Sequence, residues 1–277
     1  MAKDTSIVEN IDDVMLSHDI ETTLEHVISI MPQLARWLIK SGVGYPEFIV
    51  ALKAVFYNEA IKELDQIQQK KTDSAISLLS GLHRREVRNF CQTYGEYALV
   101  DQFNFQLPIS VPARVIGMWI NQKLPLQLPF YGAENSFESL VKQISSDKHP
   151  KSILQELKRL GIVHEEDDQV IMQKSSFISS PQVDESKQLL SQNISDHLAA
   201  GISNLTQNTN FLEQAVVADE LSKESVEKLN QLSMDLWGMM AKAIMAAAID
   251  YCKNDEGSSE ANNRFRLGIY QYGETEK

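Results

Sequence analysis

Hydrophobic residues recur at intervals of three and four positions along most of the chain, which is the spacing of helices with one apolar face. The pattern becomes regular at Glu21 and runs to Ser41, and a second stripe opens at Pro46. Pro32 falls inside the first stripe, and because proline has no N–H to donate, we expect a kink or a new helix start there. Residues 1–20 show little periodicity, so we expect a flexible, acidic N-terminus.

Shorter helical patterns and stretches of alternating residues follow, and a serine-rich segment at 174–182 is the strongest domain boundary. Expected helices cover residues 74–80, 84–97, 113–122, 136–144, 150–160, 184–205 and 222–253. Expected strands lie in a hairpin at 163–173 and at 211–217 and 264–272. The fold class is therefore mainly α with small β content (α+β), with a tandem helix-turn-helix and winged-helix core and a C-terminal helical part with two short strands. The expected domains are 1–20 (flexible), 21–112 (helix-turn-helix), 113–176 (winged helix) and 183–277 (α/β association domain).

The segment from Asp73 to Gln92 fits a helix-turn-helix. Residues 72–74 can cap its first helix through side-chain oxygens. Ser77 is small enough for two helices to approach closely, and Gly81 tolerates the positive φ of a tight turn. The residues expected in the shared core are Ile76, Leu82, Val87 and Phe90.

The second helix of this motif is expected to present basic and amide side chains to solvent. They are His83, Arg84, Arg85, Arg88, Asn89 and Gln92. Arginine can bond phosphate or the acceptors of guanine, while asparagine and glutamine can bond adenine. The partner that this pattern predicts is double-stranded DNA. The alternative is a solvated helical hairpin within a bundle, and His83 fits a phosphate contact and a helix cap equally well.

Residues 113–173 repeat the theme as three helices followed by a hairpin, the pattern of a winged helix. Gly161 follows the third helix, where it lets the chain reverse. Four basic residues are expected to form one basic edge that contacts DNA: Lys148, Lys151, Lys158 and Arg159. The hairpin tip, Glu165 to Asp168, is acidic and would oppose phosphate contact. Protein–protein packing or dimerisation is therefore the competing use of this segment.

The net charge of −12 would normally count against a nucleic-acid partner, but it is unevenly distributed. Residues 1–30 hold one lysine and seven acidic residues, giving −6, and residues 183–277 hold eight basic and fifteen acidic residues, giving −7. Residues 31–182 carry +1. The acidity lies at the two ends, so phosphate does not repel the central part as a whole.

Cysteine usage and the N-terminus predict a cytoplasmic protein. Cys91 and Cys252 are far apart, which suits a reducing compartment, and the acidic N-terminus lacks the features of a signal peptide. The most apolar run is residues 236–249, broken by Lys242. Because these fourteen residues are fewer than the roughly 20 that a bilayer needs, we expect a buried helix and no membrane association.

No motif predicts catalysis, a cofactor or a metal site. The six histidines form no HExxH or HxH pair, and nucleotide-binding glycine loops and the GxSxG elbow of serine hydrolases are missing from the sequence. Cys91 lies on the apolar side of its helix and is expected in the core. We therefore do not expect an enzyme.

Four stretches resemble a bacterial family of unknown function, the domain family numbered sixty-five-oh-two. They are ARWLIKSGVGYPEF, TDSAISLLSGLHRREVRNF, FESLVKQISSDKHPKSILQELKRLGIV and RFRLGIYQY, and together they cover most of the chain from about residue 30. Ser80, Arg84 and Arg85 match the pattern of a hydroxyl residue before the glycine and a basic pair after the histidine. The resemblance implies one full-length family and carries over no activity.

The function expected from these patterns is a DNA-binding protein similar to transcription regulators. The alternative is a non-catalytic protein–protein interaction scaffold that uses winged-helix modules. We also expect a homodimer formed through the region from residue 183, whose long helix carries more apolar surface than two strands would cover. Packing of the same apolar face on the central domain is the alternative. That surface comprises Leu229, Leu232, Leu236, Met239, Met240, Ala243, Ala247 and Tyr251.

Overall fold

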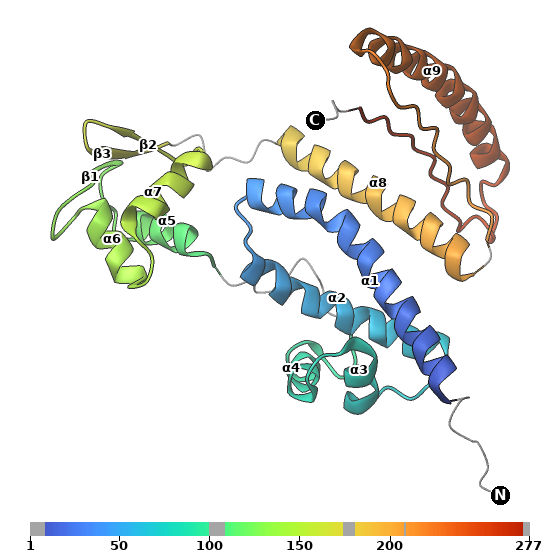
Figure 1. Ribbon diagram of the computed structural model, residues 1–277, viewed down its shortest axis with the longest axis horizontal. Helices are drawn as coiled ribbons and strands as arrows, with labels where there is room; N and C mark the ends of the chain where they lie inside the picture. The colour runs from blue at the N-terminus through green and yellow to red at the C-terminus, as the bar shows by residue number, and fades with distance from the viewer. Residues whose placement is uncertain (1–8, 100–108, 174–180, 208, 274–277) are drawn as a thin grey trace, which may run out of the picture. The chain divides into compact units, whose positions relative to one another are not determined.

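The computed structural model describes residues 9–99, 109–173, 181–207 and 209–273, and shows helices with one small sheet (Figure 1). The helices are α1 (Glu9–Lys40), α2 (Tyr45–Gln66), α3 (Asp73–Ser80), α4 (Arg84–Tyr94), α5 (Val111–Asn121), α6 (Phe137–Ile144), α7 (Pro150–Arg159), α8 (Pro181–Thr206) and α9 (Lys223–Asn254). The strands are β1 (Gln127–Pro129), β2 (Val163–Glu166) and β3 (Gln169–Met172). The α+β class with mainly α content is confirmed. Contacts divide the chain into two compact units, Met1–Ile178 and Ser179–Lys277.

Helix α1 corrects two expectations about the N-terminal part. It already begins at Glu9, within the segment expected to be flexible, and it continues through Pro32 without a new start. A proline ring removes only one backbone hydrogen bond from the ladder, and the turns on both sides of it remain. The helix ends at Lys40, before Gly42 at φ 77°.

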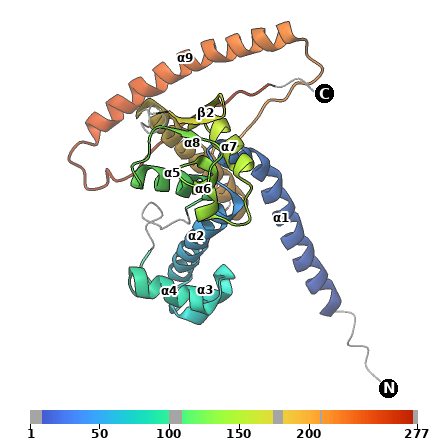
Figure 2. The same ribbon diagram turned by 90° about the vertical axis from the view of Figure 1, so that its left-hand side faces the viewer.

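Helices α2, α3 and α4 enclose the first of two separate cores, and we call them the α2–α4 bundle. Helices α3 and α4 lie side by side against α2 (Figures 1 and 2). The buried residues are Ala54, Tyr57, Ala60, Ile61, Leu64, Ile76, Val87 and Phe90. Three of the four predicted core residues are thus buried, and Leu82 is half-buried against the same cluster.

The second core lies between α5, α6, α7 and a three-stranded antiparallel sheet of order β1-β3-β2, which we call the α5–β3 unit. Its largest fully buried side chain is Trp119, whose indole N–H donates to the Pro125 carbonyl at 2.8 Å. Strand β1 was not predicted, because it has only three residues and ends at Pro129. Such a short strand gives no recognisable alternation of apolar and polar residues. It pairs with β3, so that Leu128 lies opposite Val170.

The predicted hairpin is confirmed as strands β2 and β3, paired with Val163 opposite Met172. Its turn consists of Asp167 and Asp168, both at positive φ, 47° and 59°. Aspartate is among the few residues other than glycine that adopt this conformation at modest cost, and two such residues match the twist of a two-residue hairpin. The acidic character of the tip is therefore compatible with its backbone geometry.

The C-terminal unit contains α8, α9 and two extended segments, and its two expected strands at 211–217 and 264–272 are wrong. Both segments are extended, but their partners are side chains of α8 and they form no strand ladder. Asn204 exchanges two hydrogen bonds with the backbone of Phe211. Arg264 donates to Asp196 and lowers the pKa of that carboxyl group. Alternation predicted extended backbone correctly but could not show what the backbone pairs with.

Helix α9 is exposed, so the expectation of a buried helix at 236–249 is also wrong. The helix has 32 residues, and the length argument against a membrane span, based on fourteen residues, does not hold for it. Among the described residues it is the helix that is long and apolar enough to cross a bilayer, with a mean hydropathy of 1.3 over an 18-residue window that is not buried. Length and composition alone do not distinguish a membrane span from a core helix of a soluble protein.

Candidate functional site

The residues predicted to contact DNA begin at the turn between α3 and α4. Thr72 caps α3 by accepting a hydrogen bond from the Ala75 N–H at 3.1 Å. At the other end of the helix, Gly81 adopts φ 71°, and the Ser77 hydroxyl donates to the Leu82 carbonyl at 2.7 Å. Helix α4 then starts at Arg84. The predicted positive φ of Gly81 is confirmed, and Ser77 contributes a hydrogen bond across the turn that its predicted role as a small contact residue did not include.

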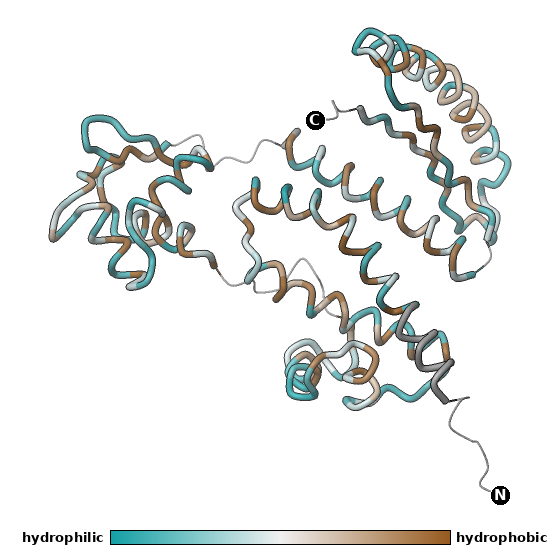
Figure 3. Tube along the Cα trace, in the orientation of Figure 1, coloured by the Kyte–Doolittle hydropathy of each residue, from teal (hydrophilic) through white to brown (hydrophobic). Residues whose placement is uncertain are grey.

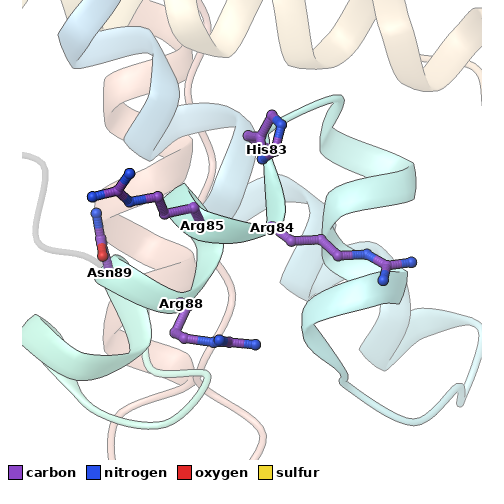
Figure 4. A pocket seen from close by; sticks show the side chains of 5 residues that line it. All are labelled: His83, Arg84, Arg85, Arg88 and Asn89. Atoms are coloured by element: carbon purple, nitrogen blue, oxygen red, sulfur yellow. The ribbon is translucent and has the colours of Figure 1, made fainter.

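All six predicted contact residues of this segment are exposed, and five line one hollow of about 470 Å³. The lining residues are His83, Arg84, Arg85, Arg88 and Asn89. Figure 4 shows Arg84 and Arg88 projecting to one side of the helix and Arg85 and Asn89 to the other. Each pair is separated by four positions, one helical turn. Gln92 continues the same exposed face one turn further on, outside the hollow.

The single acidic residue among these arginines is directed away from them. Glu86 accepts a hydrogen bond from the Lys53 ammonium of α2 at 2.6 Å and another from the His83 backbone N–H at 3.1 Å. The Lys53 contact is the main reason why the pKa of Glu86 lies below its ordinary value. The negative charge is thus compensated from beneath α4, and the outer face keeps its positive charge.

The three arginines differ in how far they are compensated. Arg88 forms a long ion pair of 3.4 Å with Asp73 at the start of α3, and its side chain remains 66% exposed. Arg84 and Arg85 have no carboxylate within ion-pair distance among the described residues. Since two of the three charges are available to an external anion, the first two turns of α4 form a basic surface.

The inner side of α4 carries a contact that the sequence did not indicate. The Tyr57 hydroxyl of α2 lies 3.4 Å from the Cys91 sulfur, and burial is the main reason why the pKa of Tyr57 is raised. Cys91 is half-buried and packs against the first core, as expected. This contact fixes α4 on α2, so the arginines project from a firmly packed helix.

The four basic residues predicted as one edge of α7 lie near the two ends of that helix. Lys148 and Lys151 flank the start of the helix and are exposed, whereas Lys158 and Arg159 lie at its other end. Lys151 and Lys158 are seven positions apart, which is about 10 Å along the helix. The four residues of the predicted basic edge therefore form two groups near the two ends of the helix.

The second group is engaged within the chain. Lys158 pairs with Glu165 of β2 at 2.8 Å. Arg159 binds both carboxylate oxygens of Glu156, at 2.6 and 2.7 Å, and donates to the Ile39 carbonyl at 2.7 Å. The Arg159 contact lowers the pKa of Glu156. These basic side chains stabilise the helix end, and the remaining acidic residues of the hairpin tip stay exposed.

The part of the chain that the structure describes contains no cluster of metal-binding side chains. No three histidine, cysteine, aspartate or glutamate side chains come together there in a way that could hold an ion. The arrangement that remains is the basic surface of α4, which suits a polyanion.

Comparison with known proteins gives a family but no neighbour of known function. No curated protein and no solved structure matches the chain. One family model matches residues 26–277, which is most of the sequence, and its description is "Family of unknown function (DUF6502)". The chain belongs to this family.

Proposed function

We propose that the protein is a non-catalytic DNA-binding protein of the kind that regulates transcription, and that α4 is its recognition helix. In this proposal the α2–α4 bundle is a helix-turn-helix domain in which α3 and α4 are the two motif helices. The second helix of such a motif enters the major groove with its N-terminal residues against the base edges. The N-terminal end of α4 is the end that carries the arginines.

The observation that carries the proposal is the charge of this surface. Arg84 and Arg85 are exposed without a carboxylate partner among the described residues, while Glu86 is bound by Lys53 on the opposite side. Glu86 is engaged by the capping contact at the start of α4 and by Lys53, so it offsets little of the positive charge that Arg84 and Arg85 present to a phosphate.

The side chains fit two kinds of contact with a duplex. Arg84, Arg85 and Arg88 can bind phosphate or guanine, and Asn89 and Gln92 can form the paired hydrogen bonds that adenine accepts and donates. His83, at the helix start, can reach a phosphate. Lys148 and Lys151 are exposed on a separate element and could add contacts to the sugar-phosphate backbone.

Fluorescence anisotropy with a mixed-sequence duplex at low salt tests the proposal. Replacing Arg84, Arg85 and Arg88 by alanine should weaken binding by about a hundredfold or more, because three phosphate contacts are lost. The matched control removes three exposed lysines, Lys62, Lys187 and Lys223, and should change the affinity little. Equal affinity of the two triple variants, with unchanged circular dichroism, would refute the assignment to α4.

The α5–β3 unit supports a second candidate function, that of a protein-docking module with winged-helix topology. The supporting observation is its hairpin, whose exposed acidic tip would repel phosphate. The basic side chains nearest to the hairpin, Lys158 and Arg159, already form ion pairs within the chain. Salt dependence separates the two candidates. Binding through phosphate weakens steeply as salt rises, whereas apolar docking of a protein partner does not.

A further inference from the structure

The C-terminal unit leaves its apolar side chains uncovered. None of its described side chains, in residues 183–207 and 209–273, is buried. Figure 3 shows hydrophobic positions repeated along both α8 and α9. Twenty-five large apolar residues of this unit are more than a third exposed, from Val183 to Tyr272. A protein interface of ordinary size takes about 20–30 residues a side, so this surface is large enough for a stable complex.

Met234, Met245 and Ile249 lie on the opposite side of α9, and eight other exposed apolar residues form one stripe. Spacings of three and four place its members within an arc of about 120° around the helix axis. They are Leu229, Leu232, Leu236, Met239, Met240, Ala243, Ala247 and Tyr251. The stripe is about 33 Å long. The small side chains of Ala243 and Ala247 keep the surface of its C-terminal half flat. A second helix could therefore approach closely.

Six of the eight charged residues of α9 border this stripe on one flank, and the sequence of their signs is reversed when the helix is read in the opposite direction. Lys223 and Glu227 lie outside this flank and pair with each other at 3.9 Å. The flank consists of Glu224, Lys228, Asp235, Lys242, Asp250 and Lys253, within about 80° of the helix. Glu224 and Lys253 lie equally far from the midpoint between Gly238 and Met239, and so do Asp235 and Lys242. Lys228 and Asp250 match to within one residue. Each acidic residue of this flank thus has a basic residue at the mirrored position, and within one helix Glu224 and Lys228 also pair with each other at 2.7 Å.

We propose that α9 pairs antiparallel with α9 of a second copy of this chain, about a two-fold axis between Gly238 and Met239. In an antiparallel helix pair of this symmetry, the same flank of each helix faces its counterpart in the opposite direction. The charge order above then gives Asp235–Lys242, Glu224–Lys253 and Lys228–Asp250 pairs across the interface. A parallel pair would place the charged flank against the half-buried Trp237 side of the partner.

The same residues favour a second copy over a bilayer. Asp235 and Lys242 lie on either side of the middle of α9. In a spanning helix both charges would lie near the centre of the bilayer, where each is unfavourable. At the edge of a helix pair they are paired with each other and remain in contact with water.

Sedimentation velocity of the full-length protein is the first test. We expect a species of twice the 31.3 kDa chain mass at micromolar concentration. Asp235→Lys alone converts two pairs from attraction to repulsion and should raise the dimer dissociation constant about tenfold. Asp235→Lys combined with Lys242→Asp should restore it, and Glu256→Lys, a reversal outside α9, should have no effect. A monomeric full-length protein, or a double variant no better than the single one, overturns the proposal.

Cysteine cross-linking tests the antiparallel order. In a Cys252→Ser background, Met239→Cys places a thiol beside the axis, where mild oxidation should link the two chains. Leu229→Cys places two thiols about 28 Å apart along the axis and should not link them. Cross-linking of both variants would indicate a parallel pair. Cross-linking of neither, with the protein sedimenting with lipid vesicles, would indicate a membrane helix. Either result overturns the proposal.

Discussion

At the scale of single residues, the turn between α3 and α4 depends on the backbone of Gly81. Its φ of 71° is unfavourable for side chains with a branched Cβ, yet the space around a Cβ at this position is empty. The effect of a substitution there is therefore conformational, without a steric clash with neighbours.

Gly81→Val should destabilise the protein by about 2 kcal/mol, while Gly81→Asn should cost less than about 1 kcal/mol. Asparagine adopts positive φ more readily than valine, and neither side chain meets a neighbour. Urea unfolding followed by circular dichroism measures both. Similar losses for the two variants would mean that Gly81 matters through packing and contradict this account.

The Lys53–Glu86 pair should make the α2–α4 bundle sensitive to acid. Because the folded pKa of Glu86 is lowered, the pair contributes stability above the ordinary glutamate pKa of 4.5, and this contribution is lost as pH falls through the lower, folded value. Glu86→Gln should lower the free energy of unfolding by about 0.5 kcal/mol at pH 7 and leave it unchanged near pH 3. A difference that persists at pH 3 would assign the effect to packing.

Residue-level signals were the most predictable part of the site, because they depend on neighbours in sequence. The Thr72 cap, the Gly81 turn and the exposed set from His83 to Gln92 follow from a few adjacent positions. Lys53 could not be found in this way. It lies 33 positions before Glu86, and no local pattern connects the two.

At the scale of elements, the acidic hairpin of the α5–β3 unit separates DNA contact from protein contact. Asp167→Asn with Asp168→Asn removes two charges, and asparagine keeps the positive φ of the turn. If the hairpin docks a protein, as proposed, the affinity for DNA should change less than about twofold, a small effect beside the loss of one phosphate contact. A clear rise in DNA affinity, measured by anisotropy, would instead place the hairpin next to the duplex.

Helices and strands were predicted well where they pack or pair with elements close in sequence. They were predicted poorly where the partner is distant in sequence or where no strand partner exists. The hairpin of β2 and β3 was found because its two strands adjoin, whereas β1 pairs with β3 across some forty residues. The segment 264–272 alternates like a strand, but its arginines bind Asp196, Asn193 and Gln192 of α8. Alternation reports an extended backbone and does not identify its partner.

At the scale of the whole molecule, a chain with a net charge of −12 can bind DNA only through a local surface. Each lost phosphate contact should reduce the slope of log affinity against log salt by about 0.9. The Arg84, Arg85 and Arg88 triple variant should therefore show a slope smaller by about 2 to 3 than that of the unmodified protein. An unchanged slope in anisotropy titrations from low to moderate salt would locate the phosphate contacts elsewhere.

The pairing of β1 with β3 also has a consequence for the order of folding. Gln127 meets Ile171 only after the chain has passed through α6, α7 and the β2–β3 hairpin, all of which form from contacts close in sequence. Closing a loop of this length slows folding, because chain entropy is lost before the strands can pair. The contacts of the α2–α4 bundle close shorter stretches, such as the 34 positions between Tyr57 and Cys91. We therefore expect it to fold first, with β1 joining its sheet as the last strand of the α5–β3 unit.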